Sequence, residues 1–304
     1  MTTFLEHFKI DRTQSIDFRD LNLEKDTRIF LDPYSVAMTN NVHCMNAHKC
    51  IKAFMETLLT ALKEGNESLA MDLCSHFQEP KGTGIGWTKK SYKGRGAGEI
   101  KASKLVEALM SSEAVVSGAI EDLEELILVV DGLGLDTISD ITINLGMKHF
   151  IEFTQEKCKE LNINMQKSDK KINYFCHLEN KWKSDYFELP HAPIGEEKEK
   201  GQIILLPINT LARLSPYGTS YFFTNIATPY FIEEGIRGGA SFIRATKSGG
   251  YKADLKKMRE NDQYKGGKKR MGKFIKDHPE SLKEYREKVA SYRYKKIRKQ
   301  DDQT

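Results

Sequence analysis

The sequence predicts a mixed α/β protein, with a central sheet of buried strands flanked by helices and a basic, mainly helical C-terminal extension. Two observations carry this prediction. Apolar residues recur at helical spacing in several segments, which is typical of amphipathic helices. Two short runs, Leu126–Val130 and the apolar part of Gln202–Pro207, are continuous and favour strands that are buried on both faces.

The first elements expected along the chain are a short strand and two helices. The strand lies within Arg28–Pro33 and ends before the proline, because the residue before a proline disfavours the helical region. Apolar residues in Ile51–Leu62 follow the i, i+3, i+4 pattern of a helix. Gly65 is placed to end that helix in a left-handed conformation, and a second helix is expected over Glu67–Phe77.

A glycine-rich segment, Lys81–Gly98, then interrupts the helical pattern. Its six glycines and five basic residues predict a loop. Later helices are expected over Glu99–Met110, Leu145–Leu161 and Ser281–Lys299, with a hairpin over Lys171–Pro190 between them.

Charge is distributed unevenly along the chain. From Lys247 onward there are 19 Lys and Arg against 9 Asp and Glu, whereas residues 1–246 hold 28 against 34. We therefore expect an α/β core over 1–246 and a basic helical extension over 247–304 that meets nucleic acid or an acidic protein surface. No apolar stretch approaches the length of a bilayer and no signal peptide is visible, so we expect no membrane contact and a cytoplasmic location.

The five cysteines are odd in number and irregularly spaced, which predicts reduced thiols packed as small apolar groups. Four residues of metal-ligating type, His43, Cys44, His48 and Cys50, lie within eight positions. Eight residues do not readily bring four ligands around one tetrahedral ion, so an ordinary helix is expected there.

Three carboxylates, those of Asp131, Asp136 and Asp140, follow the apolar run Leu126–Val130 within ten residues. Hard divalent cations prefer oxygen ligands, and Mg²⁺ takes one or two carboxylates together with substrate phosphate. These aspartates are therefore candidate catalytic and metal-binding residues for Mg²⁺ or Mn²⁺. In the alternative interpretation, Asp136 or Asp140 caps a helix and the rest face solvent.

Basic residues form two candidate nucleic-acid-binding segments, because lysine and arginine neutralise phosphates without sequence preference. In the glycine-rich loop, Trp87 and Tyr92 could stack on bases. The loop lacks the spacing of a phosphate-binding or dinucleotide-binding motif. The candidate residues of the two segments are Lys89, Lys90, Lys93 and Arg95 in the loop, and Lys268, Lys269 and Arg270 in the extension.

Four short stretches resemble a group of poorly characterised bacterial proteins of the mobile-element and phage-defence kind. They are Phe30–Pro33, Glu121–Glu124, Asp136–Asp140 and Ile204–Pro207. A weaker similarity, to metal-dependent nucleases of the PD-(D/E)XK class, rests on Asp140 and on the Glu-x-Lys pairs Glu99/Lys101 and Glu179/Lys181. The resemblance implies a role in antiviral defence and a carboxylate-held divalent ion.

These observations lead to the hypothesis of a metal-dependent nuclease that acts on DNA or RNA, in which the ion polarises the scissile phosphate and activates water. Two alternatives remain open. The chain is instead a non-catalytic subunit that binds nucleic acid or a protein partner in a defence complex, or it processes a nucleotide or NAD at the glycine-rich loop.

Overall fold

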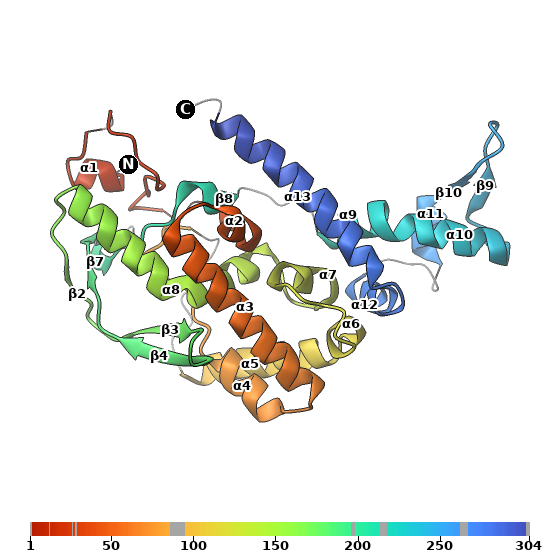
Figure 1. Cartoon of the computed structure of the whole chain (residues 1–304), viewed down its shortest axis with the longest axis horizontal. Helices are drawn as coiled ribbons and strands as arrows, with labels where there is room; N and C mark the ends of the chain where they lie inside the picture. Colours follow the sequence, from red (N-terminus) through yellow and green to blue (C-terminus); the bar gives the residue numbers. More distant parts are fainter. Residues whose placement is uncertain are drawn as a thin grey trace. The chain divides into compact units, whose positions relative to one another are not determined.

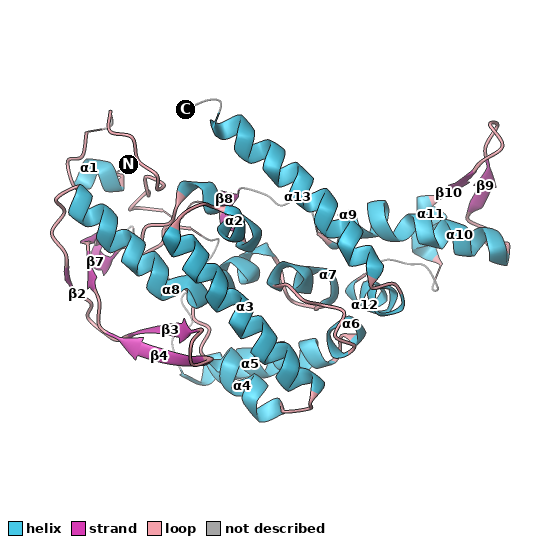
Figure 2. Ribbon diagram, in the orientation of Figure 1, coloured by secondary structure: helices cyan, strands magenta, loops and turns pink. Residues whose placement is uncertain are grey.

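The computed structural model describes residues 2–11, 13–25, 27, 29–85, 95–195, 198–212, 218–261 and 267–301, of which 95–101 and 293–301 by backbone alone. Helices account for 53% of the chain and strands for 15%, so the predicted mixed class is confirmed. Among the described residues the strands pair as five two-stranded antiparallel sheets (Figure 2). The expected central sheet is therefore replaced by separate hairpins and strand pairs, and long helices supply the main packing surfaces.

The chain divides into two compact units. Unit 1 comprises 1–106, 122–124 and 133–214, and unit 2 comprises 107–121, 125–132 and 215–304. Residues 215–246 thus cluster with the C-terminal residues, so the division differs from the expected boundary between 246 and 247.

The helical elements of unit 1 surround two long helices, α3 and α8, which pack side by side (Figure 1). They are α1 (Phe4–His7), α2 (Pro33–Met38), α3 (Val42–Lys63), α4 (Glu67–Ser75), most of α5 (Arg95–Met110), η1 (Leu123–Glu125), α8 (Leu135–Glu160) and η2 (Ile208–Thr210). The amphipathic helix predicted over Ile51–Leu62 is confirmed within α3, and Gly65 follows it with a φ of 69°, as a terminating glycine should.

The strands of unit 1 form four pairs. These are β1 (Phe30–Leu31) with β8 (Leu211–Ala212), β2 (Gln166–Lys167) with β5 (Glu188–Leu189), β3 (Ile172–Cys176) with β4 (Lys181–Asp185), and β6 (His191–Ile194) with β7 (Glu199–Gln202). The β3–β4 pair confirms the predicted hairpin. Its register, Phe175 opposite Trp182, places both rings against Phe54 of α3, with ring centroids 5.4 and 6.3 Å away.

The strand predicted over Gln202–Pro207 is buried but forms no ladder through its apolar part. The amides of Ile203, Ile204 and Leu205 donate to three different partners: Pro190 O, Gly82 O and the Thr154 hydroxyl. Buried amides need an acceptor but not a neighbouring strand. A continuous apolar run therefore predicted burial correctly and strand structure wrongly.

Unit 2 has helices and one small hairpin among its described residues. Its elements are α6 (Glu113–Val116), α7 (Leu126–Val129), α9 (Thr219–Phe222), a π-helical turn η3 (Phe223–Ala227), α10 (Thr228–Gly238), β9 (Ile243–Ala245), β10 (Tyr251–Ala253), α11 (Leu255–Glu260), α12 (Lys268–Asp277) and α13 (Glu280–Asp301). The core is aromatic: Phe222 contacts Phe274 and Tyr285, with ring centroids 6.1 and 5.5 Å apart.

The strand predicted over Leu126–Val130 is wrong, because α7 occupies this segment. The amide of Val130 donates to Leu126 O at 2.9 Å, which is a helical bond. Four or five apolar residues suit one buried helical turn as well as a strand. In addition, α8 begins at Leu135, ten residues before the predicted start, so Asp136 and Asp140 lie in a helix and not in a loop.

Glu125 links several parts of unit 2. Its buried carboxylate accepts from the Glu121 amide at 2.9 Å and from Nε of Arg286 on α13 at 2.5 Å. A charge-assisted bond of this kind satisfies a carboxylate that burial would otherwise make costly.

Among the helices in the described ranges, none is long and apolar enough to cross a membrane.

Candidate functional site

Three metal-ligating side chains from distant parts of the sequence meet in unit 1. Cys50 comes from α3, His149 from α8, and His177 from the turn that follows β3. One ligand atom of each lies within 4.8 Å of the other two. Cys50 and His149 are buried and His177 is partly exposed. Among the described residues, no other three Cys, His, Asp or Glu side chains come together in this way.

Local structure explains why these side chains converge. Cys50 lies on the buried face of α3, one turn before Phe54, and that face packs against α8. The β3–β4 ladder ends at the pair Cys176–Lys181, so His177 begins the turn. Because Phe175 is buried against Phe54, the hairpin carries His177 to the side of α3.

Hydrogen bonds orient the three groups. The Cys50 thiol lies 3.5 Å from Nδ1 of His177 and donates to Phe175 O at 3.4 Å. Nδ1 of His149 lies 2.8 Å from Oε2 of Glu152, one turn along α8. That contact leaves Nε2 of His149 for a ligand. A carboxylate on the second ring nitrogen is a frequent support for a metal-binding histidine.

Burial favours the uncharged forms of Cys50 and His149. It raises the pKa of the Cys50 thiol to about 11, so the thiol is protonated at neutral pH. Burial also lowers the pKa of His149, and the opposing effect of the Glu152 carboxylate is smaller, so this imidazole is neutral. A thiol with a raised pKa is a weak nucleophile. A metal ion that binds this thiol has to displace its proton, because the thiolate is the ligand.

Comparison with known proteins gives one match. A family model described as a domain of unknown function (DUF8370) matches residues 9–217. The chain belongs to this family. No curated protein and no solved structure matches. Cys50, His149 and His177 all lie inside the DUF8370 region, whereas α9 to α13 lie outside it.

The three aspartates expected to hold Mg²⁺ or Mn²⁺ do not form a three-ligand group among the described residues. Asp131 is exposed after α7 in unit 2, whereas Asp136 and Asp140 lie in the first two turns of α8 in unit 1. The N-cap of α8 is Gly134, without a side-chain cap. The alternative in which Asp136 or Asp140 caps the helix is therefore wrong.

The candidate nucleic-acid-binding residues have different surroundings. Lys89, Lys90 and Lys93 lie outside the described residues, and Arg95 begins α5 with its side chain outside the description. On α12, the Lys268 ammonium donates to Val130 O at 2.8 Å and the Arg270 guanidinium lies 5.1 Å from the Phe231 ring centroid. Of these three, only Lys269 is exposed.

The sequence signal for the cluster was incomplete. The metal-ligating residue types within 43–50 do not share one site. His43 Nε2 lies 2.9 Å from Oε2 of Glu156, and Cys44 is buried. His48 lines the cavity described below. His149 and His177 are 99 and 127 residues from Cys50. Only the hairpin and the α3–α8 contact bring them near, so spacing along the chain could not reveal them.

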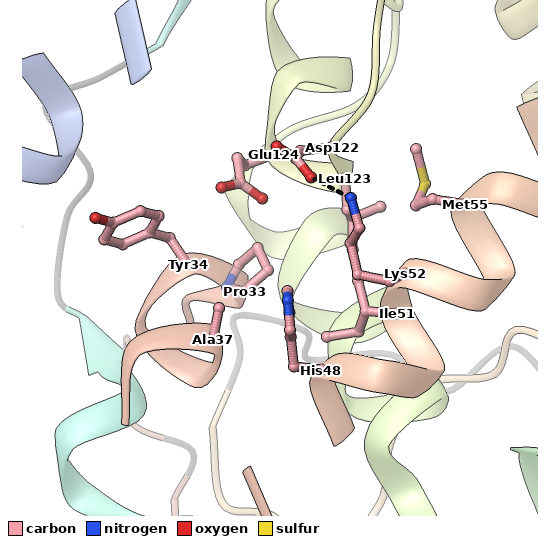
Figure 3. Close-up of a pocket in the computed structure, with 10 residues that line it drawn as sticks. All are labelled: Pro33, Tyr34, Ala37, His48, Ile51, Lys52, Met55, Asp122, Leu123 and Glu124. Carbon is pink, nitrogen blue, oxygen red and sulfur yellow. Dashed lines mark hydrogen bonds and ion pairs between the residues drawn. The ribbon is translucent and has the colours of Figure 1, made fainter. Parts of the chain in front are cut away.

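A cavity of about 220 Å³ lies in the DUF8370 region, on another face of α3 (Figure 3). It is lined by Pro33, Tyr34, Ala37, His48, Ile51, Lys52, Met55, Asp122, Leu123 and Glu124. Lys52 Nζ lies 3.4 Å from Oδ1 of Asp122. Burial first, and the Lys52 charge second, lower the pKa of His48. The lining contains no serine or cysteine nucleophile, and we assign it no reaction.

Proposed function

We propose that the DUF8370 region of this chain binds a zinc-like transition-metal ion through Cys50, His149 and His177. The observation that carries this proposal is the convergence of one sulfur and two nitrogen ligand atoms within 4.8 Å. Thiolate and imidazole ligands select zinc and related ions, whereas Mg²⁺ and Mn²⁺ prefer oxygen.

The spacing of the ligand atoms supports zinc. At Zn–S of about 2.3 Å and Zn–N of about 2.0–2.1 Å, sulfur and nitrogen donors of a tetrahedral site lie about 3.5 Å apart. Cys50 Sγ and His177 Nδ1 have this separation. The ligand atoms of the remaining pairs need to approach each other by at most about 1.5 Å.

An ion held in this way joins α3, α8 and the β3–β4 hairpin. Because an unfolded chain does not preform such a site, binding of the ion stabilises the folded state. Three protein ligands also leave one tetrahedral position for water or a further ligand. The geometry supports a stabilising role for the bound ion, and the fourth position makes the site a candidate for catalysis.

The decisive experiment is metal binding by the full chain after chelator treatment. We expect one Zn²⁺ per chain, and we expect Co²⁺ to give a thiolate-to-metal charge-transfer band. His177→Ala and Cys50→Ser should abolish both signals. Cys158→Ala is the matched control, because Cys158 is also a buried thiol of unit 1 but belongs to no ligand group. Equal binding by Cys50→Ser and the control would refute the proposal.

A positioning role of Glu152 can be separated from simple folding defects. Glu152→Gln keeps the side-chain shape but removes the charge that favours the imidazole proton on Nδ1. We expect affinity for Zn²⁺ to fall by about 10–100-fold, with an unchanged melting temperature of the metal-free chain.

The Mg²⁺- or Mn²⁺-dependent nuclease suggested by the aspartates remains a separate prediction.

A further inference from the structure

We infer that the exposed face of α12 binds the phosphate backbone of nucleic acid without sequence preference. This inference concerns unit 2 and is independent of the metal site. It rests on how α12 divides its basic residues between its two faces.

The inward face of α12 is apolar, and its apolar side chains are buried in the core of unit 2. Met271, Phe274 and Ile275 are buried, and Phe274 contacts Phe222 and Phe231 in the core. Two basic side chains also turn inward: Lys268 donates to Val130 O, and Arg270 packs over the Phe231 ring. Partial burial lowers the pKa of Lys268, as expected for a half-buried cation.

The outward face of α12 is a stripe of lysines. Lys269, Lys273 and Lys276 are all exposed, and their spacing of four and three residues places them on one side of the helix. The stripe extends over the eight residues 269–276, which is about 10 Å of helix. A linear array of this kind suits a linear polyanion.

Two carboxylates lie close to Lys276 at one end of this stripe: Glu113, whose hydrogen bond does most to raise the pKa of Lys276, and Asp277 of α12, whose charge adds to this effect. Glu113 of α6 pairs with Lys276, with Nζ and Oε2 2.9 Å apart. The Lys276 bond lowers the pKa of Glu113, and the charges of Lys273 and Lys269 add to this effect. Neither Lys269 nor Lys273 forms an ion pair within the described ranges. Two of the three lysines are therefore available to a partner, and the third is shared with Glu113.

The chemistry of the stripe favours nucleic acid over other polyanionic surfaces. Binding to an anionic membrane usually combines basic residues with an exposed apolar face, and the apolar face of α12 is buried. Duplex DNA offers one negative charge per ~1.7 Å of axis, and lysine contacts release its counterions. The stripe contains no arginine fork or aromatic ring for base recognition, so binding should depend on phosphates alone.

The test uses the full chain and labelled duplex DNA and RNA of two unrelated sequences, with affinity measured across a salt series. Lys269→Gln/Lys273→Gln removes two phosphate contacts. The slope of log affinity against log salt should therefore fall by about 2, and affinity at low salt should drop at least tenfold. Both sequences should be affected equally.

The control is Lys159→Gln/Lys170→Gln, which removes the same charge from exposed positions of unit 1. We expect this variant to bind like the unmodified chain. An equal loss in both double variants would mean that net charge, not the stripe, drives binding, and would overturn the inference. So would an unchanged slope in the α12 variant, or tighter binding to phosphatidylserine vesicles than to either nucleic acid.

Discussion

Unit 1 gathers ligand-type side chains inside its fold, whereas unit 2 spreads its cations over a helix surface. Cys50, His149 and His177 come from three elements; the first two are buried where the three meet, and His177 is partly exposed. Lys269, Lys273 and Lys276 come from one helix and remain exposed. The first arrangement depends on tertiary structure and selects an ion by geometry. The second needs only a helix and an anchoring core, and it selects a partner by charge.

The largest effect is expected from truncation of the chain, which tests whether the fold of unit 2 depends on the C-terminal helices. Truncation after residue 246 removes α12 and α13, and with them Phe274 and Tyr285, which contact Phe222. We expect hydrogen exchange to show loss of protection over 219–238 and retained protection in α3 and α8. Full protection over 219–238 in the truncated chain would instead support the sequence-based boundary at 246.

The next largest effect is expected when a glycine of unit 1 is substituted and the free energy of unfolding is measured. Gly82 has a φ of 84°, and a Cβ there would lie 2.2 Å from the backbone oxygen of Gln202. Gly82→Ala should cost about 2–4 kcal/mol in free energy of unfolding, from strain and steric overlap. Gly65→Ala is the control: its φ is 69° but nothing lies within 4 Å, so about 1 kcal/mol is expected. Equal costs, measured by denaturant unfolding, would contradict the close approach.

The metal site of unit 1 should depend steeply on pH, unlike the lysine stripe of unit 2. The pKa of the Cys50 thiol is raised to about 11, so zinc displaces a proton at every pH below that value. Affinity should therefore rise about tenfold per pH unit between pH 7 and pH 9, or about 1.4 kcal/mol per unit. A flat profile in competition titrations would exclude Cys50 as a ligand. Nucleic-acid binding should stay nearly constant over this range.

The smallest effects concern the aspartates. Asp136 lies in the first turn of α8, where a negative charge stabilises the helix, so Asp136→Asn should cost about 0.3–1 kcal/mol. Replacing Asp131, Asp136 and Asp140 together by Asn should leave zinc binding unchanged. If Mg²⁺ or Mn²⁺ raises the melting temperature or supports cleavage, and the triple variant loses this, the nuclease prediction gains support and the zinc site is not the sole metal centre.

Local patterns in the sequence predicted local structure well. The apolar spacing of Ile51, Phe54 and Leu58 located part of α3. Of the residues expected on the inner face of the C-terminal helix, Leu282, Tyr285 and Val289 are buried in α13, whereas Tyr292 is 46% exposed. A hairpin was expected over 171–190, and the one observed covers 172–185, so its existence was predicted correctly but its second strand, 181–185, begins earlier than expected. In each case the period of burial is recorded in consecutive residues, so neighbours along the chain suffice.

Features that depend on distant partners could not be predicted. The run Leu126–Val130 has no period that separates a helical turn from a strand, and the amides of 203–205 use acceptors from three separate segments. His149 and His177 lack any local motif. Two glycines of the glycine-rich segment have a structural role. The carbonyl oxygens of Gly82 and Gly84 accept hydrogen bonds from the amides of Ile204 and Thr27. Part of a segment interpreted as phosphate-binding therefore contributes to the packing of unit 1.

The path of the chain also constrains how such proteins can diverge. Residues 107–121 and 125–132 belong to the matched DUF8370 region and yet to unit 2, where α6 and α7 contact α12. A recombination event near residue 217 would separate α12 from the surfaces on which it packs. We therefore expect that the C-terminal helices are not exchanged among relatives without α6 and α7, on which α12 packs. We expect substitutions at Ala114, Val115 and Leu128 to covary with those on the inward face of α12.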